Sequence, residues 1–239
     1  MPDYETIYRE HADVYNAMVA REDYAGRLLP ALNRIRSLAG LDVIEMGAGT
    51  GRITRLLAPV VKSIAAFDRE AAMLGVAAKT LTPRNGHLAV GDNRRLPAAD
   101  RCADVALAGW SLGHAQRWYP DTWSRETDQA VDEMRRVLRP GGTILIIETL
   151  GTGRETPQPP HAGLAAYYAY LESRHGFART WIRTDYKFES LEEEERLIRF
   201  FFGDEMADRL VREYPIILPE CTGIWSSTIG QDVQRIEIG

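Results

Sequence analysis

The feature of this sequence that most constrains its fold is a glycine-rich segment directly after a short apolar one. Residues 43–52 read Val-Ile-Glu-Met-Gly-Ala-Gly-Thr-Gly-Arg. Glycine allows a tight turn and a close approach of the backbone to a ligand, and the free N–H groups at the start of a following helix favour such contacts. The segment therefore predicts a strand that ends in a ligand-binding turn and leads into a helix.

The glycine spacing differs from that of the turn that binds nicotinamide dinucleotides. That turn has glycine at its first, third and sixth positions, whereas here glycine occupies the first, third and fifth positions (residues 47, 49 and 51) and Arg52 the sixth. The carboxylate of Glu45, at the end of the strand, is a poor neighbour for a pyrophosphate and suits a ligand that is cationic or rich in hydrogen-bond donors. A turn with a structural role alone remains the alternative interpretation.

Short apolar segments alternate with amphipathic ones between about residues 42 and 150, which is typical of an α/β fold. Strands are predicted at residues 43–46, 63–68, 87–90, 104–108 and 143–147. Residues 139–142, Arg-Pro-Gly-Gly, predict a turn before the last of these strands. Strands separated by helices form a parallel sheet with right-handed crossovers, and ligands bind at the carboxyl ends of its strands.

The segments before and after this block predict further helices and strands. We expect helices at residues 4–17, 25–39, 162–175 and 191–213, strands at 178–188 and 222–228, and a loop at 151–163. The acidic run 192–195 is expected to be a solvated helix start, and the aromatic residues 167, 168 and 200–202 are expected to pack in a core or to line an apolar pocket. We expect one domain made of an N-terminal helical cap (1–40), a ligand-binding core (41–150) and a substrate-side part (151–239) with a helical insert at about 190–214.

Composition and charge narrow the classes of protein that this chain can represent. It has 239 residues, 45% of them hydrophobic, with 29 basic and 34 acidic side chains and a net charge of −5. Residues 1–150 carry 19 basic and 19 acidic side chains, so the whole excess of acid falls in residues 151–239. An acidic substrate-side part makes a nucleic-acid partner unlikely, because phosphates are repelled there.

The two cysteines and five histidines of the chain show no disulfide framework and no zinc-ligand spacing, so no metal site is expected. No apolar segment is long enough to span a bilayer, and the N-terminus lacks the apolar core of a signal peptide. We therefore expect a cytoplasmic protein with no membrane partner. Nothing in the sequence selects an oligomeric state.

Four motifs in register resemble the class I S-adenosylmethionine-dependent methyltransferases, in particular the type 11 enzymes similar to the ubiquinone and menaquinone methyltransferases. They are Glu45-x-Gly47-x-Gly49-x-Gly51, Asp68 at the end of the second strand, Gly91-Asp92-Asn93 after the third, and residues 133–142 before the fifth. The resemblance covers roughly residues 40–150. It implies a Rossmann-like, doubly wound, mostly parallel seven-stranded sheet with an antiparallel last strand.

The resemblance also implies a site for S-adenosyl-L-methionine. The glycine turn would hold its methionine part, Asp68 would accept hydrogen bonds from two ribose hydroxyls, and residues 92 and 93 would contact adenine. The expected cofactor-binding residues are Tyr15, Glu45, Gly47, Ala48, Gly49, Thr50, Gly51, Asp68, Arg69, Asp92, Asn93, Gly109 and Trp110. As alternatives, Asp68 can serve as a helix cap and Asp92 can cap or stabilise a turn.

The segment after the fourth strand supplies a candidate catalytic residue. Histidine ordinarily has a near-neutral pKa, which suits a general base, so His114 is the candidate. A packed or surface histidine is the alternative interpretation. Trp110 can stack on a ligand or pack in the core. Tyr8 and Tyr15 resemble the cofactor-covering segment of the family, but at helical spacing they can equally be core residues.

The sequence therefore predicts transfer of a methyl group from S-adenosylmethionine to an oxygen, nitrogen or carbon atom of a small molecule by in-line displacement. Two alternatives stay open. One is a methyltransferase of the same fold that acts on tRNA or protein, and the other is a protein that binds the cofactor without catalysis. The identity of the acceptor cannot be read from the sequence.

Overall fold

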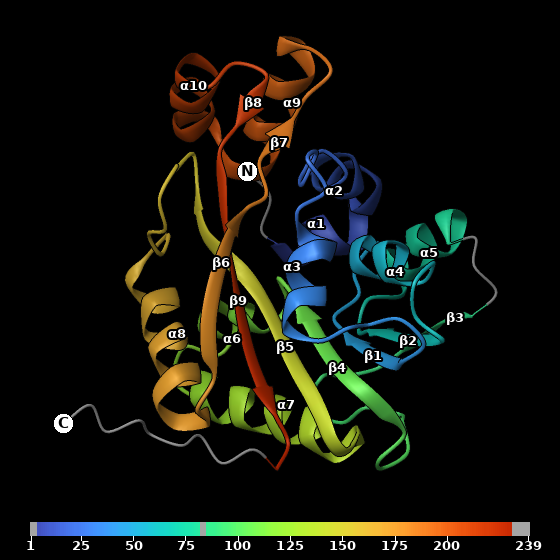
Figure 1. Ribbon diagram of the computed structural model, residues 1–239. Coiled ribbons are helices and arrows are strands. Elements are labelled where there is room, and N and C mark those ends of the chain that lie inside the picture. Colours follow the sequence, from blue (N-terminus) through green and yellow to red (C-terminus); the bar gives the residue numbers. More distant parts are fainter. Residues whose placement is uncertain (1–3, 82–84, 231–239) are drawn as a thin grey trace.

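A seven-stranded sheet in the order β3-β2-β1-β4-β5-β9-β6 forms the centre of the molecule (Figure 1). The computed structural model describes residues 4–81 and 85–230. The strands of this sheet are β1 (Asp42–Met46), β2 (Ser63–Asp68), β3 (Gly86–Val90), β4 (Ala103–Gly109), β5 (Leu138–Thr152), β6 (Ala178–Arg183) and β9 (Glu220–Thr228). Strands β1 to β5 pair in parallel, whereas β9 is antiparallel to both β5 and β6. The predicted fold class, including the antiparallel last strand, is confirmed.

Helices cover both faces of the sheet (Figure 1). The helices are α1 (Tyr4–Glu10), α2 (Ala12–Val19), α3 (Leu28–Ile35), α4 (Arg52–Leu57), α5 (Ala71–Thr80), α6 (Ala115–Trp118), α7 (Trp123–Val137), α8 (Ala162–His175), α9 (Leu191–Phe202) and α10 (Asp204–Glu213). Helices α3 and α4 pack on one face of the sheet and α7 and α8 on the other. Side chains alternate between these faces, as the pleat requires: Val105 and Leu107 belong to the first core, and Ala106 and Ala108 to the second.

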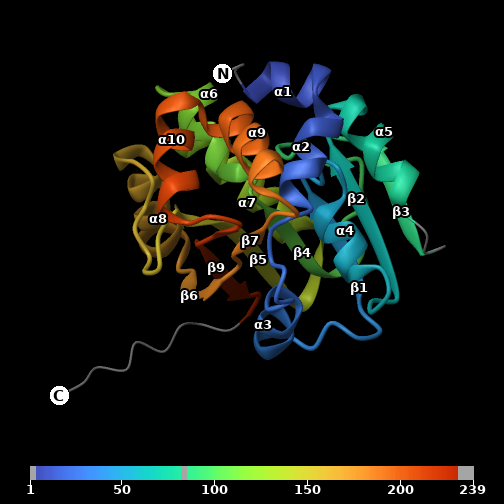
Figure 2. The same cartoon turned by 90° about the horizontal axis from the view of Figure 1, so that it is seen from above.

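The helices near the C-terminus lie beyond one end of the sheet, close to the N-terminal helices. Seen from above, α2 lies between α5 and α9 (Figure 2). Met18 of α2 is buried in one apolar cluster with Leu197 of α9 and Leu210 of α10. Two short strands, β7 (Tyr186–Lys187) and β8 (Ile217–Leu218), form a separate small sheet beside these helices. The single strand expected at 178–188 is therefore wrong, because this segment is divided into β6 and β7, which belong to different sheets, and β8 was not predicted. Helices α2, α9 and α10 therefore pack together beyond the same end of the large sheet.

Several expected boundaries are wrong, each for a local reason. The helix expected at 191–213 is interrupted at Gly203, whose φ of +86° is unfavourable for other residues. The helix expected from residue 25 begins at Leu28, because the Asp23 carboxylate accepts the N–H groups of Arg27 and Leu28 at 2.8 and 3.0 Å. The helix expected at 4–17 is interrupted at His11, which separates α1 from α2.

Two expectations from residues 139–142 and 192–195 also need correction. Strand β5 runs through Arg139–Gly142, but Leu138 pairs with Ala103 and Thr143 with Val105, so these four residues bulge out of the ladder. The acidic run is not wholly solvated, because Glu194 is 0% exposed and its Oε2 accepts the Ile216 N–H at 2.8 Å.

In the ranges 4–81 and 85–230, no helix is both long and apolar enough to cross a membrane.

The face of the sheet that α8 covers depends on one large aromatic side chain. Trp225 of β9 is fully buried, stacks on Tyr168 at 4.6 Å between ring centroids, and donates from Nε1 to Glu172. We predict that Trp225→Ala lowers the free energy of unfolding by about 3–5 kcal/mol in urea titrations, because it leaves a large cavity in the core. Trp181→Ala, at a side chain that is 46% exposed on the adjacent strand, should cost no more than about 0.5 kcal/mol. Equal losses in the two variants would contradict this packing.

Candidate active site

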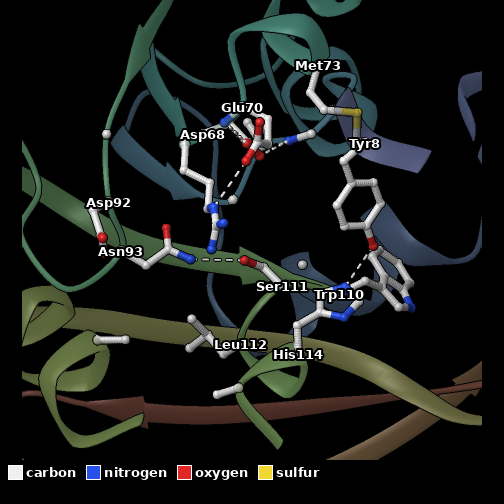
Figure 3. A pocket seen from close by; sticks show the side chains of 18 of the residues that line it. Tyr8, Asp68, Glu70, Met73, Asp92, Asn93, Trp110, Ser111, Leu112 and His114 are labelled. Atoms are coloured by element: carbon white, nitrogen blue, oxygen red, sulfur yellow. Dashed lines mark hydrogen bonds and ion pairs between the residues drawn. The ribbon is translucent and has the colours of Figure 1, made fainter. Parts of the chain in front are cut away.

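A cavity opens at the carboxyl ends of β1, β2 and β4, where the strand order reverses between β1 and β4 (Figure 3). Ligands of doubly wound sheets bind at such a position. Of the sequence-predicted residues, those that line it are Tyr15, Glu45, Gly47, Ala48, Gly49, Thr50, Asp68, Arg69, Asp92, Asn93, Gly109, Trp110 and His114. Residues that the sequence analysis did not single out, such as Ser111, Met73 and Trp118, line it as well. The topology thus gathers side chains from four separate loops.

The glycine turn has a conformation that other residues cannot adopt without strain. Gly47 has a φ of +67°, and a Cβ atom there would overlap the Ser111 side chain. Gly51 has a φ of +80°, and its Cβ would lie 2.9 Å from that of Ala77. Gly51 is not part of the cavity wall and immediately precedes α4, so its role in this structure is to allow the helix to start and to pack. Because Gly47 and Gly49 have no side chains, the backbone of the turn is accessible from the cavity.

Asp68 joins the glycine turn to the end of β2. Its Oδ2 accepts the Gly49 N–H at 2.7 Å, and its Oδ1 accepts the Glu70 N–H at 2.8 Å. The second bond goes to the residue before α5 and not to an N–H within the helix, so Asp68 is not the helix cap. Burial raises the pKa of Asp68, while these two N–H groups oppose that shift. Each carboxylate oxygen can accept a further hydrogen bond from a ligand.

Two further polar side chains of the cavity are buried beside this turn. Glu45 is 1% exposed and its Oε2 accepts the Thr54 hydroxyl at 2.6 Å. Burial raises the pKa of Glu45 to about 8, although the Thr54 hydrogen bond acts in the opposite direction. The Thr50 hydroxyl oxygen is buried without a hydrogen-bond partner. A buried hydroxyl that makes no hydrogen bond is costly, so this atom is suited to meet a polar ligand.

The residues after β3 form a charged rim on the opposite side of the cavity. Asp92 pairs with Arg94, which also contacts Glu126 at 2.8 Å, and the Arg94 guanidinium lowers the pKa of Asp92. Asp92 also accepts the Arg94 N–H, so it stabilises a turn while it lines the cavity. Asn93 donates to the Ser111 hydroxyl at 3.0 Å, which links this rim to the segment after β4 (Figure 3).

His114 lies on the wall near the N-terminal helices. The Tyr8 hydroxyl and His114 Nε2 are 2.8 Å apart (Figure 3). The imidazole stacks on Trp118 at 4.8 Å between centroids. Burial lowers the pKa of His114 to about 4, and the nearby Arg117 acts in the same direction. The ring is therefore neutral at physiological pH, and its Nε2 shares a hydrogen bond with the Tyr8 hydroxyl. The contact joins α1 to the segment after β4.

A second cavity adjoins the first on the side of the C-terminal helices. Both cavities are lined by Tyr8, Tyr15, Arg52, Trp110 and His114. The rest of the second wall comes from residues that include Glu22, Glu148, Tyr186, Phe201, Phe202 and Glu220. The aromatic residues that were expected to pack in a core or to line a pocket do both. Phe201 and Phe202 line this cavity, and Phe200 contacts His11. Tyr167 and Tyr168 are core residues.

Arg52 lies on the wall between the two cavities. In the sequence it stood out only as a departure from the dinucleotide motif. Its Nη1 lies 2.7 Å from Glu22 Oε2, and its guanidinium lies 3.6 Å from the Trp110 ring centroid. Its place directly after the third glycine of the turn, at the first residue of α4, was the signal available in the sequence. Among the residues that the structure describes, no group of His, Cys, Asp and Glu side chains could hold a metal ion.

Comparisons with known proteins agree on one family. Residues 44–146 match a family model described as a methyltransferase domain. The malonyl-[acyl-carrier protein] O-methyltransferase of Pectobacterium atrosepticum is 30% identical over 146 residues, which cover 59% of this chain and 51% of that protein. The ubiquinone/menaquinone biosynthesis C-methyltransferase UbiE of Rubrivivax gelatinosus is 27% identical over 149 residues, 56% of this chain and 54% of that protein.

Solved structures share the fold. Phosphoethanolamine N-methyltransferase 2 of Haemonchus contortus, in complex with phosphomonomethylethanolamine and S-adenosylhomocysteine, superposes with a TM-score of 0.58 at 17% identity and covers 95% of this chain and 60% of that one. The chain is thus similar to proteins that contain a methyltransferase domain. It spans about half the length of the curated relatives that it matches.

The residues present fit S-adenosylmethionine. Three features that suit the cofactor line one cavity. The Asp68 carboxylate retains acceptor capacity, Gly47 leaves the space that a Cβ would fill, and the Thr50 hydroxyl has no hydrogen-bond partner. Glu45 and Asp68 place acidic groups where the cofactor would bring hydroxyls and positive charge.

The environment of His114 generates a pH prediction. Because burial holds its pKa at about 4, its ring should stay neutral throughout the range from pH 8 to pH 5 in NMR titrations of the imidazole resonances. Tyr8→Phe should change the chemical shifts of the His114 ring at constant pH, because it removes the hydroxyl at Nε2. A His114 that titrates at its ordinary value near 6.5 would contradict the buried, Tyr8-bound ring.

Proposed function

We propose that this protein transfers the methyl group of S-adenosylmethionine to a small-molecule acceptor. The observation that carries the proposal is the pair of adjoining cavities that share Tyr8, Tyr15, Arg52, Trp110 and His114. The first has the residues suited to the cofactor, and the second provides a separate site for an acceptor. The names of the relatives, which act on malonyl-[acyl-carrier protein] and on quinones, support a small-molecule or carrier-bound acceptor without selecting one.

In this proposal the first cavity binds the cofactor through the predicted residues. Asp68 accepts hydrogen bonds from the two ribose hydroxyls, the turn at residues 47–50 contacts the methionine part, and Asp92 and Asn93 lie at the adenine end. S-adenosylmethionine, when bound, supplies a methyl group that is already activated by a positively charged sulfur atom. The protein therefore needs mainly to align the acceptor with that group, and alignment can contribute about 7–11 kcal/mol in favourable cases.

The residues of the shared wall perform the remaining tasks. Tyr8 and Tyr15, whose rings are 5.3 Å apart, cover the cavity and exclude water. His114 is neutral at physiological pH, as a general base must be, but its low pKa makes it a weak one. We infer that it acts mainly by holding Tyr8 in place, and that alignment, not proton transfer, accounts for most of the rate.

The cofactor assignment predicts a selective loss of affinity. Asp68→Ala should weaken binding of S-adenosylmethionine by roughly tenfold or more in calorimetric titrations, since two hydrogen bonds to a charged group are lost. Asp104→Ala serves as the matched control, because Asp104 lies at the amino end of β4 and pairs there with Arg139 at 2.8 Å. It should bind the cofactor like the unmodified chain.

Two outcomes would contradict the proposal. Full affinity in Asp68→Ala would show that the ribose assignment is wrong. Absence of binding to the unmodified protein at high micromolar cofactor would overturn the function itself. Transfer of a labelled methyl group to a component of a metabolite extract then separates an enzyme from a protein that only binds, and a labelled product found solely in RNA would exclude a small-molecule acceptor.

A further inference from the structure

Resting on the function proposed above, we propose that the acceptor is a small hydroxylated amine whose ammonium group is bound by Glu220 and Glu148 in the second cavity. The wall of this cavity combines carboxylates with the rings of Tyr15, Tyr186, Phe201 and Phe202. Aromatic faces and carboxylates together form a favourable environment for an organic cation.

Glu220 provides the most direct evidence. Glu220 is 1% exposed and lines the cavity, and its Oε1 accepts the Thr149 hydroxyl at 2.6 Å. Its Oε2 is buried without a hydrogen-bond partner. A buried carboxylate oxygen that lacks a partner is costly to maintain, and a ligand that donates a hydrogen bond to it removes this cost.

Glu148 adds a second carboxylate at the same end of the sheet. It belongs to β5, which pairs with the strand that carries Glu220, and it is 4% exposed. Its Oε1 accepts the Gly113 N–H at 2.9 Å, one residue before His114 on the shared wall. A donor group bound by Glu148 therefore lies close to the border with the first cavity.

The charges of the chain leave these two carboxylates uncompensated. Among the described side chains no ion pair joins Glu148 or Glu220 to a Lys, Arg or His. Burial raises the pKa of each to about 8, and for Glu220 the neighbouring Glu22 acts in the same direction. Arg52, a buried cation on the same wall, is already paired with Glu22 and stacked on Trp110, and Arg117 lines the wall as well. An ammonium group bound between Glu148 and Glu220 favours their ionised form, whereas a carboxylate or phosphate bound there opposes it.

Two donor atoms explain why we expect an oxygen in addition to the amine. Arg52 Nη2 and Gln116 Nε2 are both buried without a partner, and both residues line the second cavity. A hydroxyl or carbonyl oxygen of the ligand would satisfy them, and a neutral oxygen is enough for this purpose. The cavity is therefore suited to a ligand with an ammonium group and a separate oxygen acceptor.

The proposal is tested by binding matched ligand sets to the complex with S-adenosylhomocysteine. One set is tyramine, tyrosol and para-hydroxyphenylpropanoate, and the other is 4-aminobutanol, 1,4-butanediol and 5-hydroxypentanoate. Within each set only the terminal group changes, from amine to alcohol to carboxylate. We expect at least one amine to bind roughly tenfold or more tightly than its alcohol in calorimetry, because a charge-assisted hydrogen bond is gained, and the carboxylates to bind most weakly.

Two glutamine variants show whether this preference originates in the cavity. Glu220→Gln should bring the amine and its alcohol to nearly equal affinity, since the shape is kept and the charge removed. Glu194→Gln is the matched control: Glu194 is also 0% exposed and has an unpartnered oxygen, but it lies against β8 and lines neither cavity. It should keep the full preference. If Glu220→Gln does not fold, Glu148→Gln carries the same expectation.

Equal binding of amine and alcohol, tighter binding of the carboxylate, no binding of either amine, or a preference that persists in Glu220→Gln would each overturn the inference. S-adenosylhomocysteine is titrated first in every experiment. Failure at that step contradicts the proposed function, whereas normal binding of S-adenosylhomocysteine without an amine preference contradicts only the assignment of the acceptor.

Discussion

The hydrogen bond from Gly49 to Asp68 is the interaction on which the rest of the site depends. It fixes the glycine turn after β1 against the end of β2 at 2.7 Å, and the turn in turn determines where α4 begins. Because Gly47 has no side chain, the Ser111 side chain can lie against it, and Ser111 then receives the hydrogen bond of Asn93. Four strand ends are thereby held around one cavity by contacts among five residues.

The border between the two cavities follows from the next residues of the same segment. Arg52, at the first position of α4, contacts Glu22 from the N-terminal part and Trp110 from the end of β4. Glu22 also accepts the Thr184 hydroxyl at 2.9 Å, which connects this group to the region between β6 and β7. Arg52, on the wall of both cavities, is thus connected through Glu22 to the segment between β6 and β7.

The sequence predicted the sheet and most of the first cavity because both depend on local signals. Strand periodicity identified β1, β2 and β4 closely, and the parallel topology alone brings Asp68, Asp92 and Trp110 to one edge. The interruptions at His11 and Gly203 were missed, since helical periodicity continues through both. The sequence indicated an apolar pocket at Phe201 and Phe202 as one possibility, but it did not indicate the carboxylates of the second cavity. Glu22, Glu148 and Glu220 are more than seventy residues apart in the chain, and only the pairing of β5 with β9 and the packing of the segment after α2 bring them together. The burial of Glu194 was missed for the same reason. Its acidic run is typical of an exposed helix, and its contact with Ile216, distant in the chain, cannot be seen in the sequence.

In the proposed function, the cavity at the carboxyl ends of β1, β2 and β4 holds the cofactor beside the acceptor cavity. A crystal structure of the protein with S-adenosylhomocysteine is the decisive measurement. We expect the ribose at Asp68, the amino-acid part along residues 47–50, and the sulfur atom facing the wall formed by Tyr8, Trp110 and His114. A ligand bound elsewhere on the chain, or in this cavity with its sulfur directed away from that wall, would show that this arrangement is wrong.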